Sequence, residues 1–333
     1  MPRKFWREFA LASDARLADS CLRIFPAAPT LLIFVFHSLF ESEAEIARGL
    51  MDPQQAVTTA MFRDLVAELR GQGYGFASPE DVIAGLDPSR RFAMLTFDDG
   101  YANNIRALPA LEEFQVPAVF FIASNYVLTG KPFWWDVAFR EMRQRDLGSV
   151  KLAAARARWK SLRTCDAEKE VMAEFGSAAF QTVSEIDRPF TAAELAALAR
   201  HPLVHIGNHT ADHAILTNYS PAEMREQIRG AQAVLEAITG RIPVMMAYPN
   251  GNVSKPVLQA AHEAGIRLGV TVRAGRNKIA SARSKTGALL LKRYTLWGDR
   301  DLGAQCRVAR SPLSLQSAWA ALRSRADQSS WTS

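Results

Sequence analysis

The chain has 333 residues, of which 48% are hydrophobic and 22% are charged, and its formal net charge is +6. These proportions are typical of a globular protein with a sizeable core, and they exclude an intrinsically disordered or fibrous chain. The three cysteines lie far apart and fit neither a disulfide framework nor a thiolate metal site, and the diffuse positive charge without a recognised motif predicts no nucleic-acid partner.

Residues 1–24 are predicted to form a peripheral helix. The first apolar run, residues 31–36, is shorter than a membrane span or the apolar region of a standard signal peptide. We therefore expect a cytoplasmic protein. The aromatic residues 5–11 either pack against the domain or lie on the inner membrane face as an amphipathic segment, which would give peripheral membrane association.

Residues 30–123 alternate between apolar runs of strand length and segments with helical spacing. The predicted strands are residues 30–36, 74–76, 91–98 and 118–123. The predicted helices are residues 58–70, 79–86 and 101–114, and residues 41–53 are predicted to be a loop. Strands that alternate with helices in this way indicate a parallel α/β sheet.

Residues 131–190 interrupt the alternation, because they are rich in arginine and alanine and contain no strand-like run. We predict that they form a helical insertion between two strands. Trp134 and Trp135, near its start, either line a sugar-binding cleft, where their faces would stack on pyranose rings, or anchor the insertion to the core.

The alternation resumes at Thr191, which forms a predicted capping box with Glu194, and Ser220 and Glu223 repeat that pattern. The remaining predicted helices are residues 191–200, 220–238, 254–264 and 311–325. The remaining predicted strands are residues 203–207, 244–247, 266–272 and 289–296, with a turn at 248–251 and a basic loop at 273–285. We expect one domain over residues 25–310, followed by a C-terminal helix and tail over residues 311–333.

About seven strands alternating with helices predict an α/β fold, a distorted (β/α)7-type barrel with a helical insertion. The candidate catalytic residues all follow the carboxyl ends of predicted strands. They are His37, Asp98, Asp99, His209 and the turn 248–251. Because an α/β barrel carries its active site at that edge, we expect these residues to meet there.

Asp98, Asp99, His209 and His213 form the centre of the predicted site. Two adjacent carboxylates after a buried strand repel each other unless a cation compensates their charge. Two imidazoles and one carboxylate are a ligand set of hydrolytic zinc sites. We therefore expect Asp99, His209 and His213 to hold one divalent metal ion, zinc by default, although nickel or cobalt would fit the same ligands. Asp98 would be the free base beside them.

His37 and the turn 248–251 complete the predicted chemistry. His37 would protonate the leaving nitrogen, because imidazole titrates near neutral pH, although a lone histidine at a strand end can also be structural. A backbone N–H of the turn would stabilise the oxyanion. The turn residues with this supporting role are Tyr248, Pro249, Asn250 and Gly251.

The segments Thr-Phe-Asp-Asp-Gly at 96–100 and His-Thr-x-x-His at 209–213 together resemble the polysaccharide deacetylases of carbohydrate esterase family 4, the NodB-homology domain. The resemblance extends from about residue 30 to residue 297. It implies a distorted (β/α) barrel and metal-dependent removal of N-acetyl groups from amino sugars. It also implies Asp98 as the base and Asp99, His209 and His213 as the metal ligands.

The chain departs from the family pattern at two places. The family's arginine ahead of Pro-Tyr-Gly is missing from residues 247–251, and we expect Arg293 to take its place beside the base. The late Leu-x-His motif is also absent, because no histidine follows His262. Residues 36–38, Phe-His-Ser, resemble the early Tyr-His segment of poly-N-acetylglucosamine deacetylases, whose strand order is permuted, and this supports His37 as the acid.

We therefore expect a metal-dependent hydrolase that removes N-acetyl groups from an amino-sugar-containing polysaccharide or glycolipid precursor. This glycan or glycolipid would be its binding partner, and the enzyme would meet it at the inner membrane face. Two alternatives stay open, namely an amidase of the same fold acting on a small non-sugar C–N amide, and a catalytically silent glycan-binding module. The complete Asp-Asp-His-His set disfavours the module, since a binding site does not need a free aspartate beside a metal. The sequence predicts neither the sugar nor the oligomeric state.

Overall fold

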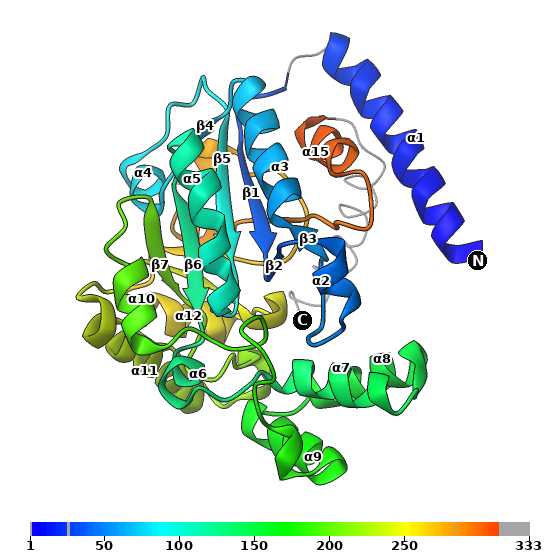
Figure 1. Cartoon of the computed structure of the whole chain (residues 1–333). Helices are drawn as coiled ribbons and strands as arrows, with labels where there is room; N and C mark the ends of the chain where they lie inside the picture. The colour runs from blue at the N-terminus through cyan, green and yellow to red at the C-terminus, as the bar shows by residue number, and fades with distance from the viewer. Residues whose placement is uncertain (1, 25–26, 283, 313–333) are drawn as a thin grey trace.

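The computed structural model describes residues 2–24, 27–282 and 284–312, with no side chain described for residues 2–12 or residue 285. Its centre is a parallel sheet in the order β10-β1-β5-β6-β7-β8-β9, with β4 beside β5 (Figure 1). These strands are β1 (Leu31–Phe36), β4 (Gly75–Phe76), β5 (Phe92–Phe97), β6 (Ala118–Ile122), β7 (Val204–Asn208), β8 (Met245–Ala247), β9 (Leu268–Val270) and β10 (Tyr294–Thr295). A separate parallel pair consists of β2 (Leu39–Phe40) and β3 (Val57–Thr58).

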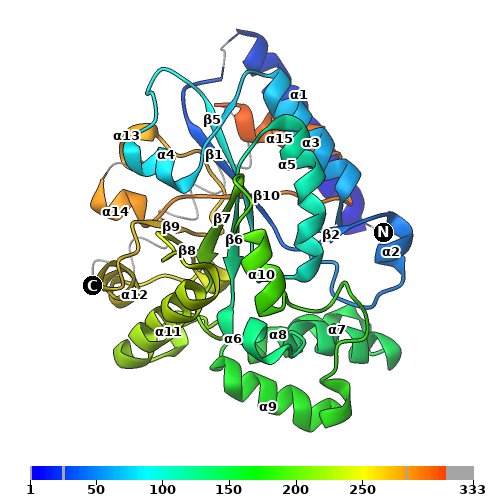
Figure 2. The same ribbon diagram turned by 60° about the vertical axis from the view of Figure 1, so that its left-hand side comes forward.

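One short segment links the two ends of the sheet. Leu291 forms a parallel bridge with Val270 of β9, and further along the same segment Tyr294 of β10 pairs with Phe34 of β1. The sheet therefore curls into a half-barrel with helices around it (Figure 2), which confirms the predicted distorted barrel.

Fifteen α-helices and four 3-10 helices are found in the described part of the chain. Outside the insertion, the α-helices are α1 (Pro2–Ile24), α2 (Glu43–Ala47), α3 (Thr59–Gly71), α4 (Pro79–Ala84), α5 (Leu108–Phe114), α6 (Ser124–Thr129), α10 (Ala192–Leu198), α11 (Pro221–Thr239), α12 (Lys255–Glu263), α13 (Ile279–Ala282), α14 (Lys285–Ala288) and α15 (Leu302–Arg310). The 3-10 helices are η1 (Ala102–Ala107), η2 (Ser177–Ala179), η3 (Leu216–Asn218) and η4 (Pro249–Gly251). Both predicted capping boxes are present, at the starts of α10 and α11.

The strands β1, β5 and β6 are buried on both faces, which is why their sequences read as nearly continuous apolar runs. Alternate residues of β1 enter different clusters. Leu32 and Phe34 pack with the helix residue Phe62, whereas Leu31 and Ile33 pack in a second cluster to which β5, β6, β8 and β9 contribute. The polar side chains of the candidate site therefore lie beyond the carboxyl ends of these strands.

The predicted insertion contains the helices α7 (Trp134–Gln144), α8 (Gly148–Trp159) and α9 (Thr164–Phe175), and residues 180–190 are irregular, with an isolated bridge at Pro189 instead of a strand. These helices lie beyond the carboxyl ends of β5 and β6 (Figure 1). They share a buried aromatic cluster with the barrel, in which Trp134 and Trp159 meet Tyr101 and Tyr126. The insertion is therefore packed as a fixed wall over the catalytic edge of the barrel.

Two predicted loops contain helices, and two other predicted elements differ in part from the structure. The predicted loop 41–53 contains α2, which Ser42 caps by accepting a hydrogen bond from the Glu45 N–H. The basic loop 273–285 contains α13, and α14 occupies the residues just before the predicted strand 289–296, of which two residues, Tyr294 and Thr295, form β10. The predicted helix 101–114 begins as the 3-10 helix η1 and becomes α-helical at Leu108.

The C-terminal helix α15 was not predicted. The predicted helix 311–325 and tail lie outside the described residues, apart from residues 311 and 312. Ala304 and Val308 of α15 pack against Ala15 and Ala18 of α1, so the N-terminal and C-terminal helices lie side by side (Figure 1). Among the described helices, none combines the length and the apolar character needed to cross a bilayer.

Candidate active site

Asp98 and Asp99 follow β5 at the edge where the insertion lies. The Asp98 N–H continues the sheet ladder by donating to the Phe36 carbonyl at 2.9 Å. Asp99 then adopts a left-handed conformation, with φ of 76°, and Thr210 and His213 do so as well, with φ of 62° and 52°. Such conformations are costly for residues other than glycine and concentrate at functional sites. The strained turns let side chains from β5 and β7 converge.

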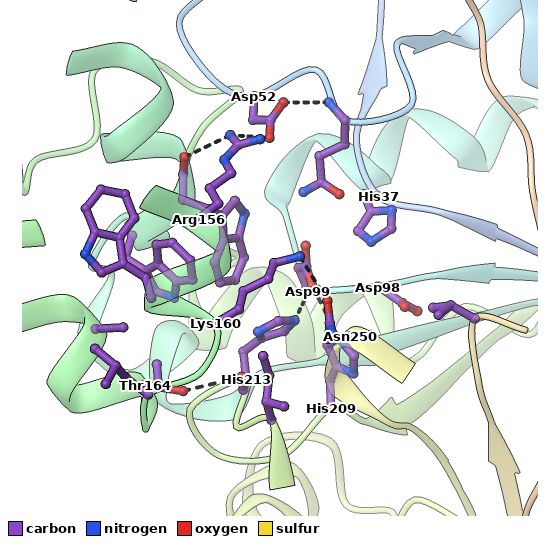
Figure 3. A pocket seen from close by; sticks show the side chains of 18 of the residues that line it. His37, Asp52, Asp98, Asp99, Arg156, Lys160, Thr164, His209, His213 and Asn250 are labelled. Carbon is purple, nitrogen blue, oxygen red and sulfur yellow. Dashed lines mark hydrogen bonds and ion pairs between the residues drawn. The ribbon is translucent and has the colours of Figure 1, made fainter. Parts of the chain in front are cut away.

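Asp99, His209 and His213 form one compact cluster (Figure 3). Asp99 Oδ1 lies 3.3 Å from Nε2 of His209 and 3.3 Å from Nε2 of His213. One atom of each residue can be chosen so that all three lie within 4.8 Å of one another. The structure thus brings together the three residues predicted to bind a metal ion.

The hydrogen bonding of His209 shows which of its nitrogens faces the cluster. Nδ1 lies 2.8 Å from the Ala247 carbonyl oxygen, which can only accept, so Nδ1 carries the hydrogen and the neutral ring presents a bare Nε2. Asp99 Oδ1, which this nitrogen faces, is buried and accepts no hydrogen bond. Two lone pairs that face each other repel unless a cation lies between them. The donor set therefore fits a divalent metal ion with nitrogen and oxygen ligands.

The pKa values of the cluster reflect the same charge balance. Burial alone would raise the pKa of Asp99, but the facing His209 and His213 rings outweigh it and hold this pKa well below the usual range. Burial would lower the pKa of His209, but Asp99 and the charge of Asp98 outweigh it and raise this pKa. For His213 burial prevails and lowers the pKa. Asp99 is therefore ionised, and a cation between these residues would be stabilised.

Asp98 forms a buried two-point ion pair with Arg293. The Arg293 Nη1 and Nη2 atoms donate to Asp98 Oδ1 at 2.6 Å and Oδ2 at 2.7 Å, and Nε donates to the Thr271 carbonyl at 3.0 Å. Burial would raise the pKa of Asp98, but the charge of Arg293 outweighs it and lowers this pKa. Arg293 thus lies where the family resemblance implied an arginine, and it holds Asp98 ionised and fixed in orientation.

His37 lies in the same pocket and is oriented by Gln55, a residue that the sequence analysis missed. The Gln55 amide nitrogen donates to the Val35 carbonyl at 2.6 Å and the Leu296 carbonyl at 3.0 Å, which uses both of its hydrogens. Its oxygen, 2.8 Å from His37 Nδ1, must then accept, so Nδ1 carries a hydrogen. Nε2 of His37 is therefore the nitrogen free to exchange a proton. No sequence pattern marks a glutamine in a polar loop as buried.

The loop that carries Gln55 is held in a strained form. Gln54 and Ala56, on either side of Gln55, have φ values of 47° and 54°. The Gly298 N–H donates to the Gln55 carbonyl at 2.7 Å, and a Cβ on Gly298 would lie 1.9 Å from the Ala56 carbonyl oxygen. Gly298 is thus required for the close approach that keeps Gln55 against His37.

A pocket of about 390 Å³, one wall of which is formed by the insertion, is lined by His37, Asp98, Asp99, His209 and His213 (Figure 3). The insertion contributes aromatic and basic side chains, which are Trp134, Trp135, Arg156, Trp159 and Lys160. Trp135 packs on the metal-cluster residue His213 with ring centroids 4.6 Å apart. The pocket therefore joins the aspartate and histidine cluster of the barrel to an aromatic and basic wall of the insertion.

The sequence profile of the polysaccharide deacetylase family matches residues 85–269, a stretch that contains both motifs. The chain belongs to the polysaccharide deacetylase family. This confirms the family that the two motifs resembled. YxkH of Bacillus subtilis, whose name describes a polysaccharide deacetylase, is 20% identical over 212 residues, which cover 62% of this chain and 55% of that relative. The match therefore spans little more than half of the curated relative.

Solved deacetylase structures share the fold. The deacetylase PplD of Streptococcus pyogenes, solved with acetate, superposes with a TM-score of 0.57 over 85% of this chain and 99% of that one, at 18% identity. IcaB from Ammonifex degensii gives a TM-score of 0.56 over 86% of this chain and 99% of that one, at 15% identity. Because the sequence identities are only 18% and 15%, the structural similarity shows that the chain has the fold of the polysaccharide deacetylases and shows nothing further.

The turn after β8 contributes less to this polysaccharide deacetylase pocket than the sequence suggested. Asn250 lines the pocket, whereas Tyr248, Pro249 and Gly251 are absent from its wall. The Tyr248 hydroxyl donates to the Leu289 carbonyl at 3.0 Å, and the Gly251 N–H donates to the Tyr248 carbonyl at 2.8 Å. The Gly251 N–H is therefore engaged within the turn instead of being free for an oxyanion.

The tryptophan pair has the anchoring role that the sequence analysis considered, and stacking of the pair on a sugar stays a prediction. Trp134 and Trp135 both line the pocket, yet they are 4% and 7% exposed. The Trp135 indole N–H donates to the Tyr101 hydroxyl at 2.8 Å, which fastens the insertion to the barrel. In this deacetylase family member the pair anchors the wall and also forms part of its surface.

Proposed function

We propose that the protein is a metal-dependent hydrolase that removes N-acetyl groups from an amino-sugar-containing polysaccharide or glycolipid precursor. The observation that carries this proposal is the buried, unpartnered Asp99 Oδ1 facing two imidazole nitrogens, with the arginine-paired Asp98 in the same pocket. Membership of the polysaccharide deacetylase family supports the same reaction class.

Asp99, His209 and His213 would hold the metal ion, with zinc as the default and nickel or cobalt compatible with the same ligands. A divalent ion held there would activate water and polarise the amide carbonyl. The side chains supply orientation and proton transfer. The Trp135 ring against His213 restricts the movement of that ligand and keeps one side of the cluster apolar.

Asp98 acts as the base in this proposal. Its carboxylate is ionised, and each oxygen that accepts from Arg293 retains another lone pair. Asp98 can therefore take the proton of the attacking water without turning away from Arg293. The two-point contact fixes the plane of the carboxylate, so that the proton acceptor is already in place when water attacks.

His37 acts as the acid. Its Nδ1–H is held by the Gln55 oxygen in both protonation states, so the exchangeable proton is carried on Nε2. When the C–N bond breaks, His37 Nε2 gives that proton to the leaving sugar nitrogen. The acid comes from the end of β1, consistent with the absence of any histidine after His262.

Metal content of the purified protein tests the proposal. We expect about one equivalent in the wild type and loss of the metal in Asp99→Ala and His209→Ala. His201→Ala is the matched control, because His201 pairs with Glu112 at the surface and should leave the metal in place. A wild type without metal, which also takes up none on addition, would overturn the hydrolase assignment.

Acetate release separates this function from an amidase of the same fold. The proposal predicts acetate from N-acetylated amino-sugar oligomers and none from small cyclic or linear amides. The reverse pattern would assign the site to a small amide, and a metal-loaded protein that binds glycans without any hydrolysis would assign it to a binding module. We further propose that the substrate is a cytoplasmic precursor at the inner membrane face, in keeping with the net charge of +6.

A further inference from the structure

We propose that Lys160 makes the pocket selective for amino sugars that carry an anionic group, a carboxylate or a phosphate, which the ammonium group binds while the N-acetyl group lies at the Asp99–His209–His213 cluster. This inference rests on the proposed deacetylase function and specifies its substrate class. It concerns a residue of the helical insertion, outside both motifs.

Lys160 is a solvent-exposed residue whose side chain lines the pocket and is held there by neighbouring amides. Lys160 follows α8, and Figure 3 shows its side chain directed toward Asn250 and the cluster. Its Nζ donates to Asn250 Oδ1 at 2.9 Å, and Asn250 Nδ2 donates to Asn252 Oδ1 at 2.9 Å, which fixes the amide so that its oxygen faces the lysine. The Asn218 side chain binds the Lys160 carbonyl at 2.9 Å, so the main chain is fixed too.

Among the described residues Lys160 has no carboxylate partner, in contrast to Arg293 and Arg156. Asp98 pairs with Arg293, and Asp52 pairs with Arg156 at 2.5 Å. Within the part of the chain that the structure describes, no carboxylate forms an ion pair with Lys160, whose hydrogen-bond partner is the neutral amide of Asn250. An ammonium group held in a pocket by a neutral acceptor can receive an anionic ligand without losing an ion pair of its own.

Arg156 lies beside Lys160, and its own charge is offset by the ion pair with Asp52. It lies one helical turn before Lys160, so the two side chains project from one face of α8. Both line the pocket, and the buried Nε of Arg156 has no hydrogen-bond partner. The pKa of Lys160 is lowered by loss of surrounding water at the pocket wall, although the residue as a whole is solvent-exposed, and by the charge of Arg156. An anion beside Lys160 would offset the repulsion from Arg156.

The charge of the metal site adds to this preference. The negative charge of Asp99 partly stabilises the Lys160 ammonium group. A divalent cation on Asp99 and the two neutral histidines would leave that cluster with a net positive charge and remove this compensation. The loaded pocket would then carry excess positive charge on both the barrel side and the insertion side. A neutral acetylated sugar leaves this charge unbalanced, whereas an anionic sugar balances it.

Paired sugars that differ in one charge test the inference. Acetate release is compared between N-acetylglucosamine 1-phosphate and N-acetylglucosamine, and between N-acetylgalactosaminuronic acid and N-acetylgalactosamine. We expect kcat/KM to favour at least one charged sugar by about tenfold or more in the wild type. Lys160→Met should abolish the preference for the charged sugar of each pair, and Lys160→Arg should retain most of it. Lys151→Met is the matched control, since Lys151 is an exposed lysine of the same helix.

Binding without turnover gives a second readout. Glucose 1-phosphate and galacturonate, which have no acetyl group, should bind the metal-loaded wild type more tightly than glucose and galactose in calorimetric titrations. The difference should shrink with added salt and in Lys160→Met. A preference for the phosphate pair alone would identify a glycosyl phosphate, and a preference for the carboxylate pair alone would identify a uronic acid.

Two results would overturn the inference while leaving the deacetylase function intact. One is equal kcat/KM for charged and neutral sugars in the wild type. The other is a charge preference that persists in Lys160→Met, which would place anion recognition on the metal itself. Failure of the proposed function looks different, because no acetylated sugar, charged or neutral, would then release acetate.

Discussion

At the residue scale, the orientation of His37 depends on a single buried amide. Replacing Gln55 with leucine would free the imidazole to rotate and would leave Nδ1 without its acceptor. We expect kcat of Gln55→Leu to fall about 10- to 100-fold with little change in KM or in metal content. Gln55→Glu keeps an acceptor for Nδ1 and should recover part of the rate. An unchanged kcat in a folded Gln55→Leu protein would contradict the positioning role.

Arg293 should be far more important for stability than a surface arginine with the same geometry. The side chains of Arg293 and Asp98 are 0% and 4% exposed, and Arg293→Met would leave a buried carboxylate unpaired. We expect a loss of about 3–5 kcal/mol in the free energy of unfolding, measured by urea denaturation. Arg63 makes a similar two-point contact with Glu113 at the surface, and Arg63→Met should cost about 0–1 kcal/mol.

The stabilisation by the Asp98–Arg293 ion pair should depend on pH in a defined direction. Because the pKa of Asp98 is lowered in the folded state, the stabilisation is fully present above the usual aspartate pKa of about 3.9 and is lost as the pH falls through the lower folded value. The difference between wild type and Arg293→Met should therefore be constant near neutral pH and shrink below about pH 4. Equal losses in Arg293→Met and Arg63→Met would contradict the buried pairing.

The site residues that belong to a sequence motif could be predicted from the sequence. The site residues outside any motif could not. Adjacent aspartates and paired histidines after apolar runs indicate their chemistry through spacing alone. The family pattern requires an arginine beside the base, and this arginine is missing from residues 247–251. Arg293 was therefore predicted to replace it. Gln55 and Lys160 depend on which loop and helix end fold over the pocket. That information lies in tertiary packing and leaves no local pattern in the sequence.

At the element scale, the contact between the loop before β3 and the segment after β10 constrains one glycine. A Cβ at Gly298 would meet the Ala56 carbonyl, so Gly298→Ala must displace the Gln55 loop. We expect a loss of about 1–3 kcal/mol in stability together with reduced kcat. Gly230→Ala on the exposed face of α11 meets nothing and should gain up to about 1 kcal/mol. Equal stability of the two variants in urea denaturation would contradict this account.

Long periodic elements were predictable because burial and periodicity agree in them. The strands β1, β5 and β6 and the capped helices α10 and α11 formed where expected. The apolar residues 289–296 read as one strand, but the segment first bridges β9 and then crosses to β1, so few of its residues remain in a ladder. Such a crossing is decided by closure of the barrel and not by local preference.

At the scale of the whole molecule, the N-terminal helix is the segment through which we propose membrane association. Deleting residues 1–24 should abolish flotation of the protein with anionic phospholipid vesicles. Because Ala15 and Ala18 pack on α15, retained metal content would show that the shortened protein still folds. Unchanged flotation of the shortened protein would refute a membrane role for this segment.

The long sequence separation between Asp98 and Arg293 has a consequence for the order of folding. All three proposed metal ligands follow β5 and β7, which the sheet places on either side of β6, whereas the arginine that neutralises the base is supplied 195 positions later, when β10 reaches β1. During synthesis, the ligands can therefore gather before the base has its partner. Contacts between residues far apart in the sequence form late in folding. The Asp98–Arg293 pair can therefore form only after β10 has paired with β1. If the proposed roles hold, a nascent chain would assemble the Asp99–His209–His213 cluster first and the Asp98–Arg293 pair last.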